Sequence, residues 1–252
     1  YKKKIFMMGN SHLINTRNKY KEFNNLEESD FKIFSQNGED GIIDYLLFSL
    51  KILKPKFVEI GVGDYSESNT KFIFDRTSSE GLIIDIIEDF EEKVKKNTKI
   101  WRGNLTIVKR KINSDNILST LEEFNFFKDI DLFSLDIDSI DYWVLEKLPK
   151  KFCKIIVVEY NPYFGSELKI SVPNIKNFDR SKYHYSNLCF GASLKSYTEL
   201  MTDKEFTFLG TNLFRNNAFF VNNDFIDMLS IKIPDTQNLK RFTDAQFRES
   251  RN

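Results

Sequence analysis

Apolar segments of two kinds alternate through the middle of the chain, and this alternation constrains the fold more than any other feature. Segments with apolar residues at helical spacing are followed by short runs that are apolar on both faces. Such runs are typical of parallel strands covered by helices on both sides. The sequence therefore predicts a doubly wound α/β fold. The predicted strands cover residues 57–62, 82–86, 106–112, 131–136 and 154–159, and the predicted helices cover a segment from Gly38 to before Pro55, residues 69–75, a segment through Phe90 and Val94, and residues 114–124, 140–148 and 192–201.

The ends of the chain depart from this alternation. Residues 1–34 are polar, and we expect them to form an arm or lid on a single domain that spans residues 1–252. Residues 161–190 show little periodicity, and because unpatterned loops of this length are usually functional, we expect a substrate loop. Residues 205–210 and 217–221 are expected to pair as an antiparallel hairpin at one edge of a seven-stranded, mostly parallel sheet.

The overall charge and the cysteine content narrow the range of partners. The chain of 252 residues has 37 basic and 37 acidic side chains, so no net field attracts nucleic acid or an anionic membrane. Two cysteines cannot form a disulfide framework, which favours a reducing cytoplasm. No apolar run approaches the ~20 residues of a membrane-spanning helix. We therefore expect a cytoplasmic protein without a nucleic-acid partner and without membrane insertion, and homo-oligomerisation is left open.

The segment FVEIGVGDYSESNT, residues 57–70, places a glycine turn after the first predicted strand. A dinucleotide fingerprint would have a third glycine where Ser66 stands, and no lysine follows as in a phosphate-binding loop. Glu59 is expected to point into the crevice, where it would repel a pyrophosphate and attract the cationic groups of S-adenosylmethionine. Asp85 follows Gly63 at about the 20-residue separation of an acid that holds a ribose diol.

The ordered set of these motifs resembles the S-adenosylmethionine-dependent methyltransferase superfamily. It is similar in detail to the FkbM-like branch and to bacterial capsule-type sugar O-methyltransferases. The matching segments are SQNGEDG (35–41), FVEIGVGDYSESNT (57–70), LIID (82–85), SLDIDSIDYWVLEKLP (134–149), VVEYNPYFG (157–165), FGASLKS (190–196) and NAFFV (217–221).

This resemblance implies a set of residues that contact the cofactor. The residues of the glycine turn would line its methionine and ribose side, and Asn69 would donate to its carboxylate from the start of a helix, where anions are favoured. Ordinary helix capping is the alternative role for Asn69. The residues assigned to the cofactor are Gln36, Glu59, Gly61, Gly63, Asp64, Asn69, Asp85, Asn113 and Asp136.

Two pairs of oxygen-bearing side chains end the fourth and fifth predicted strands. Asp136 and Asp138 form one pair, and Glu159 and Asn161 form the other. If the two strands are neighbours, all four side chains converge in the arrangement that Mg²⁺ prefers. The alternative for Asp138 is to cap the helix that follows.

Methyl transfer to a hydroxyl requires a base that takes the proton or a metal that lowers the pKa of the hydroxyl. Asp138 and His184 are the candidate bases, with Asp136 beside them. Arg180 and Lys182 could instead meet a substrate diphosphate. By resemblance, the expected acceptor is the hydroxyl of a nucleotide-linked sugar such as GDP-heptose, in the synthesis of capsular or other surface polysaccharide. The alternatives are an N-methyltransferase acting on nucleic acid or a small molecule, a nucleotide-binding oxidoreductase, and a non-catalytic glycan-binding module.

Overall fold

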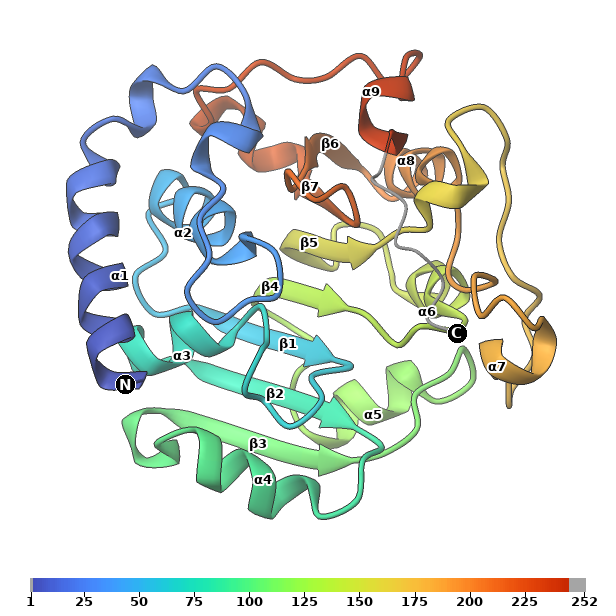
Figure 1. Cartoon of the computed structure of the whole chain (residues 1–252), viewed down its shortest axis with the longest axis horizontal. Coiled ribbons are helices and arrows are strands. Elements are labelled where there is room, and N and C mark those ends of the chain that lie inside the picture. The colour runs from blue at the N-terminus through green and yellow to red at the C-terminus, as the bar shows by residue number, and fades with distance from the viewer. Residues whose placement is uncertain (1, 245–252) are drawn as a thin grey trace.

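The computed structural model describes residues 2–244 and contains a seven-stranded sheet with helices on both faces (Figure 1). The strand order is β3-β2-β1-β4-β5-β7-β6. Strands β1 to β5 are parallel, and β7 runs antiparallel to both β5 and β6. The predicted doubly wound fold with an antiparallel edge hairpin is confirmed. The strands are β1 (Lys56–Ile60), β2 (Glu80–Asp85), β3 (Asn104–Lys109), β4 (Ile130–Leu135), β5 (Cys153–Glu159), β6 (Phe206–Thr211) and β7 (Asn217–Asn222).

Two apolar cores lie on opposite faces of the sheet because the central strands are buried on both sides. In β1, the side chain of Phe57 joins the core beneath α2 and α4, and that of Val58 joins the core beneath α5, α6 and α8. The helices are α1 (Lys2–Arg17), α2 (Glu39–Ser49), α3 (Lys71–Thr77), α4 (Phe90–Asn97), α5 (Ile117–Glu123), α6 (Asp141–Lys147), α7 (Arg180–Tyr183), α8 (Leu194–Asp203) and α9 (Lys240–Thr243), with 3-10 turns η1 (Tyr20–Glu22), η2 (Leu26–Ser29), η3 (Ile100–Arg102), η4 (Pro162–Phe164) and η5 (Asn223–Met228). In the part of the chain from residue 2 to 244, none of these helices has the length and apolarity to cross a bilayer.

The order of the strands reverses at β1: β2 and β3 follow on one side of it, and β4 and β5 follow on the other. In open parallel sheets, ligands bind beyond the carboxyl ends of the strands at such a switch point. Gly61 follows β1 with φ +85°, and a Cβ atom at this position would lie 1.5 Å from the carbonyl oxygen of Asp136. Only glycine therefore allows the ends of β1 and β4 to approach this closely.

The first helix, α1, was not predicted, because its apolar residues show no clear helical period. It lies near the amino-terminal ends of the parallel strands, on the opposite side of the molecule from their arrowheads (Figure 1). Its Leu13 is buried in a small cluster with Ile33 and Phe72. The helix is thus held by tertiary packing, which usually contributes more to helix stability than intrinsic propensity does.

A buried ion-pair cluster centred on Asp44 fixes the position of α1. The Asp44 side chain is 1% exposed and accepts hydrogen bonds from Arg17 Nε (2.9 Å) and Nη2 (2.6 Å), from the Tyr20 hydroxyl (2.8 Å) and from Arg76. Burial alone would raise the pKa of Asp44, but the hydrogen bond from Arg17 and the charge of Arg76 outweigh it and lower the pKa. One carboxylate thereby joins α1, η1, α2 and α3.

We expect Asp44→Asn to lower the free energy of unfolding by about 3 kcal/mol at pH 7, because removing one partner leaves buried charge uncompensated. A carboxylate with a lowered folded-state pKa stabilises the fold fully above its unfolded pKa of about 4 and loses that contribution as the pH falls further. The difference between wild type and variant should therefore shrink below about pH 4. Urea unfolding at pH 7 and at pH 3 measures both effects. The exposed control Asp227→Asn should change the free energy of unfolding little at either pH, and an equally small effect of Asp44→Asn would contradict the proposed role.

Candidate functional site

A cavity of about 540 Å³ opens at the carboxyl ends of the parallel strands. The turns after β1, β2, β3 and β4 form its walls, and residues 178–180 of the long loop form another side. Its walls include the sequence-predicted residues Gly61, Gly63, Asp85, Asp136 and Asp138. Residues far apart in the sequence thus meet at the switch point of the sheet.

The glycine turn and Asp85 form one wall of this cavity as a single unit. The N–H of Gly63 donates to Asp85 Oδ2 (2.7 Å), and the N–H groups of Ile86 and Ile87 donate to Oδ1 (2.6 and 3.1 Å). A Cβ atom on Gly63 would meet nothing within 4 Å. The turn therefore presents open backbone to the cavity beside a carboxylate whose position is fixed by backbone donors.

Glu59 does not face the cavity as the sequence analysis expected. Its side chain is turned toward the segment before α3 and is 4% exposed. The hydroxyl groups of Ser68 and Thr70 and the backbone N–H groups of Asn69 and Thr70 all donate to its carboxylate. Burial raises the pKa of Glu59, although these hydrogen bonds act in the opposite direction. Glu59 therefore fixes the turn before α3 through four hydrogen bonds and is not among the residues that line the cavity.

Asn69 and Asp64 stabilise the same turn. The side-chain amide of Asn69 donates to the Ser134 hydroxyl (3.0 Å), which links the turn to β4. The carboxylate of Asp64 accepts the N–H of Ser66 (2.9 Å) in a local turn. Neither Asn69 nor Asp64 is among the residues that line the cavity.

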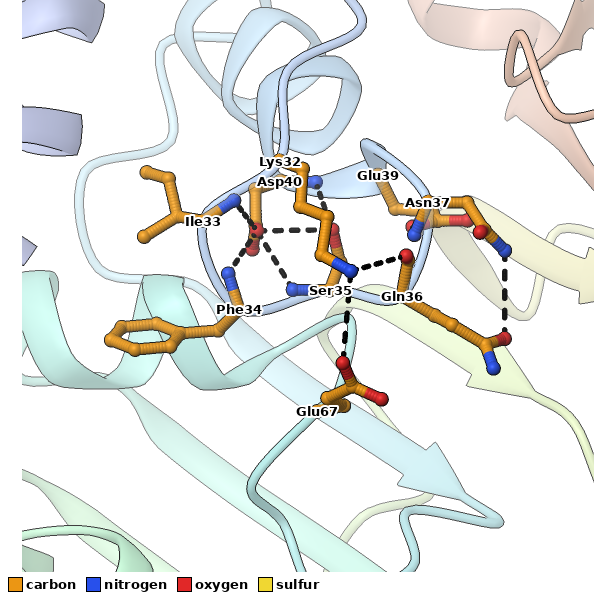
Figure 2. Close-up of polar contacts among 9 residues, drawn as sticks. All are labelled: Lys32, Ile33, Phe34, Ser35, Gln36, Asn37, Glu39, Asp40 and Glu67. Atoms are coloured by element: carbon orange, nitrogen blue, oxygen red, sulfur yellow. Dashed lines mark hydrogen bonds and ion pairs between the residues drawn. The ribbon is translucent and has the colours of Figure 1, made fainter. Parts of the chain in front are cut away.

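Gln36 lies on a loop before α2 whose shape is set by a buried acid. Asp40 is 1% exposed, and its Oδ2 accepts the N–H groups of Ile33, Phe34 and Ser35 at 2.6–2.8 Å (Figure 2). Burial raises the pKa of Asp40 to about 6. The Gln36 side chain is exposed on this loop and is not part of the cavity wall.

Asn113 shapes the turn into α5 and is not among the residues that line the cavity. Its side-chain oxygen accepts the N–H groups of Asp115 (2.8 Å) and Asn116 (3.2 Å), and its own N–H donates to the side chain of Asn116 (2.9 Å). Asn113 is 6% exposed and starts the turn into α5, while the preceding residues Lys111 and Ile112 line the cavity.

Three of the four proposed metal ligands meet at the ends of β4 and β5. One carboxylate oxygen from each of Asp136, Asp138 and Glu159 lies within 4.8 Å of the others. Burial, followed by the charge of the neighbouring carboxylates, raises the pKa of Asp136 and of Glu159 well above the ordinary values. Burial also raises the pKa of Asp138, although Arg180 opposes this. Such a cluster attracts either protons or a cation.

Asp138 does not cap α6, so the alternative role considered for it is not observed. It adopts a left-handed backbone conformation with φ +54°, which is uncommon for a residue other than glycine. Asp141 fixes this turn by accepting the N–H groups of Ile137 (2.9 Å) and Ser139 (3.0 Å). Burial raises the pKa of Asp141 to about 6. The sequence showed Asp141 only as an acid in the first turn of a helix and gave no sign of this role.

Asn161 uses its amide group to hold the long loop. Its Nδ2 donates to the carbonyl oxygens of Leu188 (2.7 Å) and Phe190 (3.1 Å), and its Oδ1 accepts the N–H of Tyr163 (3.1 Å). The fourth residue of the predicted metal set therefore connects the end of β5 to residues 188–190.

Arg180, rather than His184, brings the long loop to the acidic cluster. Arg180 forms an ion pair with Asp138, and its guanidinium lies 5.3 Å from the centre of the Phe190 ring. His184 is exposed, and its Nδ1 hydrogen-bonds to the Ser186 hydroxyl (2.7 Å). His184 does not line the cavity, so this arrangement does not place it as the base.

Comparison with known proteins gives only a distant likeness. No family model matches the sequence, and no curated protein matches it. Among solved structures, an O-methyltransferase family protein from Burkholderia thailandensis has a TM-score of 0.44 at 9% identity over 71% of this chain and 54% of that chain. An S-adenosylmethionine-dependent methyltransferase from Clostridium acetobutylicum has a TM-score of 0.45 at 8% identity over 73% and 90%, respectively. Human N-acetylserotonin methyltransferase in complex with SAM has a TM-score of 0.39 at 16% identity over 69% and 49%. The chain thus spans about half the length of the Burkholderia and human proteins, and the likeness concerns the fold alone.

The two glycines of the turn provide a matched pair of substitutions. Gly61→Ala would place a Cβ atom against the Asp136 carbonyl oxygen, so we expect a loss of about 4 kcal/mol or more in the free energy of unfolding. Gly63→Ala meets open space and carries only the left-handed backbone cost of about 1–2 kcal/mol. Urea unfolding of both variants measures the difference. Equal losses would show that the contact between Gly61 and Asp136 does not hold the site together.

Proposed function

We propose that this chain is an S-adenosylmethionine-dependent O-methyltransferase that acts on a hydroxyl group of a nucleotide-linked sugar. One observation carries the proposal: a glycine turn fixed to an acid at the end of β2 shares a cavity with Asp136 and Asp138 at the end of β4. The glycine turn and Asp85 suit an adenosyl group. Asp136 and Asp138 suit the positively charged groups of this methyl donor.

The charges of the cavity favour this donor over a dinucleotide. Asp85 has the position and chemistry to accept hydrogen bonds from a ribose diol. The sulfonium and ammonium groups of the donor would lie near Asp136, where burial and neighbouring carboxylates give a cation the most favourable interaction. A pyrophosphate in the same place would be repelled. Asp136 and its neighbours thus take over the electrostatic role that the sequence analysis gave to Glu59.

Activation of the acceptor hydroxyl is assigned to the same acidic cluster. Asp138 lines the cavity beside Asp136, and its raised pKa suits a group that takes a proton from the hydroxyl. Asp136, Asp138 and Glu159 also fit Mg²⁺, because three oxygen ligands leave coordination positions for substrate and water. When bound, the ion would lower the pKa of a hydroxyl group that contacts it. Asn161 would support this set by holding the adjoining loop.

The acceptor is assigned to the side of the cavity formed by the long loop. Phe178 offers an apolar surface there, and Arg110, Lys111 and Arg180 bring positive charge to the walls. These groups suit a sugar that carries a diphosphate. Residues 161–190 would then select the acceptor, and the glycine turn would hold the donor.

Binding of S-adenosylhomocysteine tests the donor site directly. We expect wild type to bind it in calorimetry, and Asp85→Asn to bind it about 10- to 100-fold more weakly, because a hydrogen bond to a charged group contributes about 1.5–3 kcal/mol. The exposed control Glu122→Gln on α5 should bind as wild type does. Tight binding of NAD together with no response to S-adenosylhomocysteine would refute the proposal. A screen of nucleotide sugars for a mass gain of one methyl group would then identify the acceptor.

The pH dependence of Mg²⁺ binding tests the metal assignment. Metal binding requires deprotonated carboxylates, and burial raises the pKa of all three acids, so the affinity for Mg²⁺ should rise with pH. Calorimetry in two buffers of different ionisation enthalpy measures the released protons, and Asp138→Asn should weaken binding while Asp227→Asn should not. If turnover is indifferent both to chelation and to restored Mg²⁺, proton acceptance by Asp138 remains as the route of activation.

A further inference from the structure

A second cavity, of about 700 Å³, lies on the other side of the molecule from the candidate site. Residues of α1, of the turn between α2 and β1, and of the carboxyl end of α3 line it. These elements lie toward the amino-terminal ends of the parallel strands (Figure 1). Its volume falls in the range of about 300–1,000 Å³ that is typical of small-molecule sites. The cavity shares no residue with the one at the carboxyl ends.

The charged residues that line this cavity are all basic. They are Arg17, Lys21, Lys51 and Arg76, and no acidic side chain lines it among the described residues. Asp44 lies behind the wall and pairs with both arginines. Two guanidinium groups thus share one carboxylate, which leaves a net positive charge in a partly buried place.

Arg76 is the less completely bonded of the two arginines. Arg17 donates hydrogen bonds to Asp44 from both Nε and Nη2, whereas Arg76 donates to it from Nη2 alone. The Nε of Arg76 is buried and has no hydrogen-bond partner within residues 2–244. The Arg76 side chain is 11% exposed. Since buried polar groups are nearly always hydrogen-bonded, an under-bonded guanidinium beside a cavity points to an anion.

Apolar side chains stand next to this positive charge. Phe48 is 45% exposed and Leu53 is 83% exposed, and both line the cavity. The guanidinium of Arg17 lies 5.1 Å from the centre of the Phe48 ring. A ligand with an anionic group and an apolar body would match both features.

We propose that this cavity is a binding site for a phosphate monoester with an apolar body. The phosphate group would meet Arg76 and Lys21, and the apolar body would cover Phe48 and Leu53. A soluble ester and the headgroup of an anionic lipid such as phosphatidate share this chemistry. The proposal does not depend on the function of the other cavity.

Titration of the 252-residue chain with phenyl phosphate tests the site. We expect phenyl phosphate to bind more tightly than inorganic phosphate, because the ring adds contact with Phe48 and Leu53. Arg76→Gln and Lys21→Glu should each weaken binding at least tenfold. Lys128→Glu, an exposed lysine on another part of the surface, should have no effect. Because Arg76 also contacts Asp44, Lys21→Glu decides the result if Arg76→Gln does not fold.

Vesicles separate the two sources of the ligand. Sedimentation with phosphatidylcholine vesicles that contain phosphatidate, abolished by Lys21→Glu, would assign the site to a lipid headgroup. Binding of phenyl phosphate without sedimentation would assign it to a soluble ester. The proposal is overturned if neither probe binds, or if binding persists unchanged in both Arg76→Gln and Lys21→Glu.

Discussion

The close contact between Gly61 and the Asp136 carbonyl is the constraint on which the candidate site depends. It sets the distance between the ends of β1 and β4 and therefore between the glycine turn and the acidic cluster. The N–H of Gly61 donates to Ile84 on one side (2.9 Å), and the N–H of Asp136 donates to Ile60 on the other (3.0 Å). Three strand ends are thereby held in one register, and a ligand at this point can contact all of them at once.

Several buried carboxylates near the contact between Gly61 and Asp136 accept hydrogen bonds from backbone N–H groups. Glu59 holds the turn before α3, Asp141 holds the turn before α6, and Asp40 holds the loop that carries Gln36. In each case a carboxylate accepts several N–H groups that have no partner in a helix or strand, which offsets part of the cost of its burial. The turns around the site are thus held by hydrogen bonds within the chain itself.

The sequence predicted the sheet well because its strands are buried on both faces and separated by helices with clear periodicity. It also predicted that Asp136, Asp138 and Glu159 converge, since the carboxyl ends of neighbouring parallel strands must meet. It could not predict the orientation of Glu59, because the competing donors at residues 68–70 become available only in the folded turn. It likewise gave no signal for α1, whose order depends on Asp44 and on distant apolar contacts, or for the pairing of Arg180 with Asp138 across 42 residues.

The ion pair between Arg180 and Asp138 couples the position of Arg180 in the long loop to the charge of the carboxylates at the ends of β4 and β5. Any positively charged species that engages Asp138 competes with the guanidinium of Arg180 for the same oxygen atoms. By thermodynamic linkage, such a competitor weakens the docking of the segment by the same factor by which docking weakens the competitor. The position of Arg180 would then depend on whether the carboxylates at the ends of β4 and β5 bind a cation.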